Sequence, residues 1–67
     1  SNESLKKFVV YLEQLQVNLE ALVTICEGKK EGGPVAQFEK KNVLDGLVLL
    51  KALVYKRLDL MQDLAII

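Results

Sequence analysis

Histidine and tryptophan are missing from this 67-residue chain, and cysteine, proline and methionine each occur once. Without histidine the chain lacks the side chain that most often serves as a general base or zinc ligand. A single cysteine excludes an internal disulfide, so Cys26 is expected to pack as a small apolar residue. No Gly-Lys-Ser/Thr sequence follows Gly32 and Gly33, as a phosphate-binding loop requires. We therefore predict a non-catalytic protein with no metal and no cofactor.

Net charge is absent as well, because 9 basic and 9 acidic residues cancel. No overall field attracts nucleic acid or an anionic membrane. A hairpin would gather basic side chains at its open end, as small helical RNA-binding dimers do, but acidic ones gather there too: Lys6, Lys7, Lys56 and Arg57 beside Glu3, Asp59 and Asp63. RNA binding is therefore a remote alternative. The lone cysteine and the charged amphipathic start, which is unlike a signal peptide, predict a cytoplasmic location.

Apolar residues dominate the stretch from Val43 to the end of the chain. At 100° per residue they cover roughly half of a helix circumference, which is wider than the stripe of an ordinary surface helix. A strand is excluded because the stretch has no alternation of period two. A membrane span is not expected here, because charges interrupt the run every few residues: Lys51, Lys56, Arg57, Asp59 and Asp63.

Alternating spacings of three and four residues predict a first helix over about 3–27. They define a predicted intra-hairpin seam: Leu5, Phe8, Leu12, Leu15, Leu19, Leu22 and Cys26. Val9, Tyr11 and Val23 widen this seam. A glycine-rich loop over 28–33 follows, and Pro34 suits the first turn of a second helix over about 34–67. Two alternatives remain for that helix. It is unbroken, or a short helix ends near Lys41 and Asn42 caps the longer one.

A chain of this size cannot bury so wide an apolar arc with one partner helix. We predict a single all-α domain over 1–67, a two-helix antiparallel hairpin that dimerises into a four-helix bundle. The predicted interface for self-association or for a partner lies on the second helix: Leu47, Leu50, Leu53, Val54, Arg57, Leu58, Leu60, Met61 and Leu64. An unbroken second helix of about 50 Å would project about two turns past the first at its carboxyl end, from Leu60 to Ile67.

Arg57 is the one charge within the main apolar arc, and two interpretations of it stay open. In a simple hairpin its stem covers apolar surface while the guanidinium reaches Glu3 or water. Alternatively it meets an acidic group of a partner across an interface, where it would contribute specificity more than affinity.

The turn carries a resemblance to a known family. Gly32 and Gly33, followed by Ala36, Gln37 and Phe38, resemble the layout of the small YscE/SsaE-type co-chaperones of type III secretion. Those proteins are helical hairpins that help to hold the needle subunit unpolymerised. The resemblance covers the turn region alone, and the rest of the second helix is more apolar than that family leads us to expect. It implies a chaperone for a different protein and no enzyme activity.

Two functions are therefore expected from the sequence. The first is a self-associating, non-catalytic adaptor or regulator whose partner is a second copy of itself. The second is a chaperone or co-chaperone subunit whose wide apolar face is covered by an amphipathic helix of a different protein. A discrete dimer in sedimentation would favour the first, and a monomer rescued by a co-expressed partner would favour the second.

Overall fold

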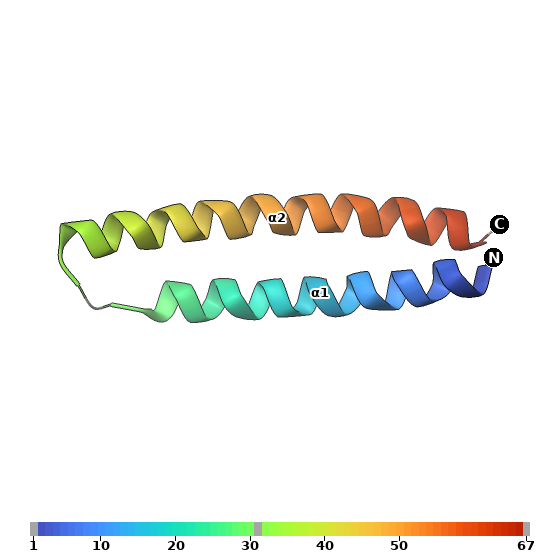
Figure 1. Cartoon of the computed structure of the whole chain (residues 1–67), viewed down its shortest axis with the longest axis horizontal. Helices are drawn as coiled ribbons and strands as arrows, with labels where there is room; N and C mark the ends of the chain where they lie inside the picture. The colour runs from blue at the N-terminus through green and yellow to red at the C-terminus, as the bar shows by residue number, and fades with distance from the viewer. Residues whose placement is uncertain (1, 31, 67) are drawn as a thin grey trace.

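The chain folds into two antiparallel helices, α1 (Asn2–Gly28) and α2 (Pro34–Ile66), in a computed structural model that describes residues 2–30 and 32–66 (Figure 1). This confirms the predicted all-α two-helix hairpin. The predicted loop position Glu31 and the predicted helix end at Ile67 lie outside the described residues. Dimerisation into a four-helix bundle stays a prediction.

The turn between the helices depends on its glycines and its proline. Gly32 has a φ of 99°, a left-handed conformation that residues with a side chain rarely adopt. A Cβ at this position would also collide with the Cβ of Ala36. Pro34 begins α2 at a position where a helix needs no N–H donor. The N–H of Gln37 then donates to the carbonyl of Gly33 at 3.0 Å, which is the first hydrogen bond of the α2 ladder.

Lys40 of α2 caps the carboxyl end of α1. Helix α1 has no basic residue in its own last turn to interact with its negative dipole end, although the N–H of Lys29 donates to the carbonyl of Cys26 at 3.2 Å. The Nζ of Lys40 donates to the carbonyl of Glu27 at 3.1 Å and also to the carbonyl of Lys29. This contact helps to fix the register of the two helices where the loop joins them.

Helix α2 runs through Asn42 without a break, so the structure has the unbroken alternative. The expected projection at the carboxyl end is wrong. Figure 1 shows the two termini side by side, while the loop continues past the end of α1 to reach the start of α2. The extra length of α2 therefore lies at its amino-terminal end, where Val35 and Phe38 are exposed. The prediction placed the start of α2 level with the end of α1, whereas α2 begins beyond that end.

The helices meet along a line that we call the hairpin seam. Its residues follow one another at spacings of three and four, and all are buried or half-buried. On α1 they are Leu5, Val9, Leu12, Gln16, Leu19, Val23 and Cys26; on α2 they are Lys40, Leu44, Leu47, Lys51, Val54, Leu58, Met61 and Ala65. Leu15 is the only other described residue that is not exposed, and it packs beside the core.

The core of the hairpin is small. Among the described residues only Leu12, Leu19, Val54 and Leu58 are buried, and each contributes about 1.5–3 kcal/mol of hydrophobic stabilisation. The molecule is a rod of 52 × 14 × 12 Å with a radius of gyration of 15.6 Å, whereas a compact domain of this length has about 11 Å. Many large apolar side chains therefore remain partly exposed to solvent.

Candidate protein interaction face

A second apolar line runs along α1 beside the hairpin seam. It consists of Phe8, Tyr11, Leu15, Leu22 and Ile25, which lie about a quarter turn around the helix from the seam. Four of the five are exposed, from 42% for Phe8 to 61% for Tyr11. The rings of Phe8 and Tyr11 stack with centroids 6.3 Å apart and planes 13° from parallel. This pair forms a flat aromatic surface that one helix holds in place.

Helix α2 carries a matching line. Its apolar members are Val43, Leu50, Leu53, Leu60 and Leu64, and all five are exposed, from 41% to 57%. They too lie about a quarter turn from the seam. Gly46 and Arg57 fall on the same line at helical spacing. Nothing in the hairpin comes within 4 Å of where a Cβ of Gly46 would stand, so this position is a gap in the line.

Both lines lie on the same side of the hairpin. Viewed from the start of each helix, each line is displaced from the seam in the same rotational sense. The two helices are antiparallel (Figure 1). Displacement in the same rotational direction therefore turns both lines toward one side of the molecule. We call this surface the open face. It consists of the ten apolar residues named above for α1 and α2, with Arg57 and the gap at Gly46.

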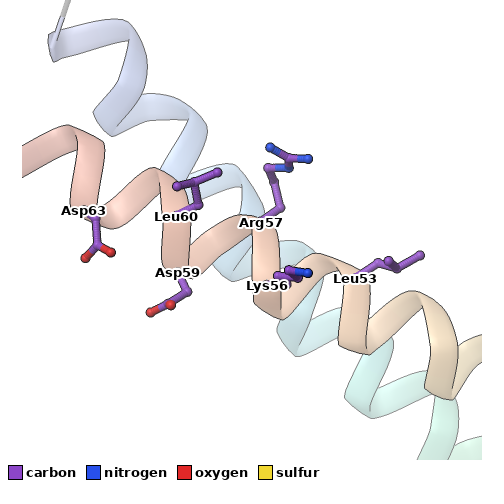
Figure 2. Close-up of a pocket in the computed structure, with 6 residues that line it drawn as sticks. All are labelled: Leu53, Lys56, Arg57, Asp59, Leu60 and Asp63. Carbon is purple, nitrogen blue, oxygen red and sulfur yellow. The ribbon is translucent and has the colours of Figure 1, made fainter.

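Figure 2 shows how Arg57 is presented. It lines a shallow hollow on α2 together with Leu53, Lys56, Asp59, Leu60 and Asp63. The side chains of Arg57 and Leu60 extend to one side of α2, whereas the carboxylates of Asp59 and Asp63 extend to the other. Within residues 2–30 and 32–66 the only ion pair is Lys41–Asp45, at 2.7 Å. The contact between Arg57 and Glu3 that one interpretation allows is therefore not made.

The predicted interface on α2 divides between two surfaces. Val54 and Leu58 are buried in the hairpin seam, and Leu47 and Met61 pack against that core. These four are corrected to intra-hairpin contacts, because the arc of α2 is wide enough to face α1 and still leave a line free. The other predicted residues lie on the open face: Leu50, Leu53, Arg57, Leu60 and Leu64.

The predicted intra-hairpin seam on α1 also needs correction. Leu5, Leu12, Leu19 and Cys26 do lie at the hairpin seam, with Leu15 half-buried beside it. Phe8 and Leu22 are exposed on the open face instead. The structure places Val9, Gln16 and Val23 at the seam instead of Phe8 and Leu22. The sequence analysis placed Val9 and Val23 only at the edge of the predicted seam, because Gln16 interrupts their line, although its spacing is as regular as that of the predicted one.

The basic residues considered for RNA binding do not form one patch. Lys6 lines a hollow with Gln62 and Asp63, whereas Lys56 and Arg57 line a different one with Asp59 and Asp63. Carboxylates are interleaved with the cations in both places. In the part of the chain that the structure describes, no three of His, Cys, Asp and Glu come together as metal ligands would. Cys26 is half-buried and has no disulfide partner.

Helix α1 is long and apolar enough, by length and composition alone, to cross a membrane. Its most apolar 18-residue window has a mean hydropathy of 1.2, and 11% of that window is buried in the hairpin. Helix α1 also carries Glu13 and Glu20, and a charged side chain at the centre of a bilayer costs at least about 2.5–3.5 kcal/mol. A soluble helix with one apolar line that faces its hairpin partner and another that faces a second protein can be as apolar as a membrane-spanning helix.

The fold and this surface define the class of the molecule as an all-α helical hairpin with one apolar face left open. Comparison with protein-family models, with curated proteins and with solved structures finds no match to this chain. The resemblance of the turn to type III secretion co-chaperones therefore stays a prediction from Gly32, Gly33, Ala36, Gln37 and Phe38.

Proposed function

We propose that this chain is a non-catalytic protein-interaction module that self-associates, with two hairpins joining their open faces into a four-helix bundle. The observation that carries the proposal is the set of exposed apolar side chains on one side of a hairpin whose total surface exceeds that of a compact protein of its mass. A folded monomer of this mass exposes about 4,200 Å². The hairpin exposes 5215 Å².

The surplus has the right size for a dimer. It amounts to roughly 1,000 Å² per hairpin, hence roughly 2,000 Å² for two, and stable protein interfaces bury about 1,200–2,000 Å² in total. A second copy also meets no net electrostatic repulsion, because the formal net charge is +0. Four-helix bundles bury helices with a wide apolar arc in this way, since each helix contacts two neighbours.

Sedimentation velocity over a range of concentrations tests the proposal. We expect a discrete dimer for the wild-type chain. We expect Leu50→Glu to weaken association at least about 1,000-fold, because Leu50 lies well inside the open face and each dimer would bury two unpaired carboxylates. Val17→Glu is the matched control, since Val17 is 60% exposed on α1 and lies outside both the seam and the open face.

Circular dichroism of both variants checks that the helices remain. A wild-type chain that stays a folded monomer at high concentration contradicts self-association. If such a monomer dimerises with an amphipathic helix of a different protein, the chaperone alternative replaces the proposal. Equal loss of association in Val17→Glu and Leu50→Glu contradicts the assignment of the interface to the open face.

A further inference from the structure

Two arrangements would join the open faces of two hairpins. In the crossed arrangement α1 of each subunit packs against α2 of the other, around a twofold axis parallel to the helices. In the like-on-like arrangement α1 packs against α1 and α2 against α2, around a twofold axis perpendicular to the helices. Both are antiparallel bundles, so the choice depends on which side chains meet.

The register within the hairpin sets the heights at which residues meet. Val9 lines one hollow together with residues 62–66 of α2, and Gln16 and Val23 line another together with residues between Val48 and Tyr55. A twofold axis parallel to the helices preserves those heights in the second subunit. Each α1 residue therefore meets the partner's α2 at about the level where it meets its own.

At those levels the two positions of the open face that are not apolar, Arg57 and the gap at Gly46, meet residues of the partner that complement them. Tyr11 comes opposite the segment of the partner's α2 between Arg57 and Leu60, and Leu22 comes opposite the segment between Gly46 and Leu50. A guanidinium over a tyrosine ring gains about 0.5–2 kcal/mol, depending on its desolvation. A leucine opposite a glycine fills a gap that the hairpin itself leaves empty.

The like-on-like arrangement lacks both matches. It places the two Arg57 side chains in one α2–α2 contact, and no described acidic residue of the open face lies near enough along the helix to pair with them. It also sets Tyr11 against apolar residues of another α1. Both features disfavour it, because a charge buried without a partner is costly.

We infer that the dimer has the crossed arrangement, in which Arg57 of each hairpin packs on the partner's Tyr11 and Leu22 of each fills the gap at the partner's Gly46. This inference rests on the proposed self-association and adds the choice of neighbours. It makes the aromatic pair of Phe8 and Tyr11 a recognition surface and Arg57 its specificity determinant.

Disulfide trapping in a Cys26→Ala background tests the arrangement. Asn18 and Leu53 lie at the outer edge of the open face, at matching levels on the two helices. In the crossed dimer Asn18→Cys of one chain lies next to Leu53→Cys of the other. We expect oxidation of an equimolar mixture of the two single variants to give a linked heterodimer, and oxidation of either variant alone to give none.

Each other outcome has a definite meaning. If each variant links to itself, the arrangement is like-on-like, and the inference fails while the proposed function stands. A dimer in sedimentation that links in neither case also overturns the inference. A background chain that is a monomer in sedimentation overturns the proposed function and the inference together.

A double-mutant cycle on Tyr11→Leu and Arg57→Met tests the contact itself. We expect Arg57→Met to weaken the dimer about fivefold more in the wild-type chain than in the Tyr11→Leu chain, because both variants remove the same contact. Independent effects of the two substitutions on the dissociation constant would overturn the pairing.

Discussion

The hairpin seam and the open face use apolar residues differently. The seam alternates buried residues such as Leu12 and Leu58 with long polar side chains, including Gln16 and Lys51. The open face carries the bulkier set, including both Phe8 and Tyr11, and leaves it in solvent. A protein that functioned as an isolated hairpin would be expected to place its largest apolar side chains at the seam. The contrast supports the proposal that the seam builds the hairpin while the open face joins a second hairpin.

The polar side chains of the seam explain how so narrow a core holds two long helices. Lys51 and Gln16 can lay their apolar stems over the buried leucines while their polar ends reach solvent. Lys40 adds a contact from α2 to the last carbonyls of α1. The seam therefore needs little bulk, and the comparison with the open face can be tested one surface at a time.

The largest difference is expected between two leucines two residues apart on α2. Leu58 is 6% exposed at the seam, whereas Leu60 is 46% exposed on the open face. At concentrations where the chain is monomeric, Leu58→Ala should lower the free energy of unfolding by about 2–4 kcal/mol and Leu60→Ala by less than about 1 kcal/mol. Urea unfolding followed by circular dichroism measures both.

At higher concentration the variants Leu58→Ala and Leu60→Ala serve as controls for each other. Where the chain is dimeric, Leu60→Ala should weaken association while Leu58→Ala acts mainly through unfolding of the hairpin. Equal losses of monomer stability in the two variants would remove the distinction between seam and open face.

Two substitutions at Gly46 test the effects of helix propensity and of interface packing separately. Because open space surrounds Gly46 in the hairpin, Gly46→Ala should stabilise the monomer by about 1 kcal/mol. Gly46→Leu should stabilise the monomer similarly but weaken the dimer by about 1–3 kcal/mol per contact, since its side chain occupies the place of the partner's Leu22. Thermal unfolding and sedimentation equilibrium report the two quantities. A Gly46→Leu dimer as tight as that of Gly46→Ala would contradict the crossed packing.

The smallest expected effect belongs to the polar end of the seam. Lys40→Met should lower the free energy of unfolding by about 0.5–1.5 kcal/mol, because the carbonyls of Glu27 and Lys29 lose their donor. Lys41→Met is the matched control. It removes a fully surface-exposed ion pair with Asp45 that is worth no more than about 0.5 kcal/mol. A larger loss in Lys41→Met than in Lys40→Met would mean that the cap contributes nothing. Neither change is expected to alter association of the folded hairpins.

Particular residues show where sequence reasoning succeeded and where it did not. Gly32, Gly33 and Pro34 predicted the turn, because paired glycines and a proline at a helix start have few other uses, but only the structure shows that Gly32 is the left-handed residue. The prediction that Phe8 and Leu22 face α2 was wrong. Leu5, Leu12, Leu19 and Cys26 belong to both possible lines of α1, so spacing alone could not decide which neighbours complete the contact.

The sequence by itself determined that the chain forms two helices joined by a glycine-rich turn, since periodicity and backbone preference are local properties. It also determined that more apolar surface exists than two helices can hide. Only the tertiary structure decided that Val9 and Val23 face α2 while Phe8 and Leu22 face outward, and that the termini are level. Those choices depend on how closely two helix surfaces approach and on the reach of Lys40, which are properties of the pair and not of either helix.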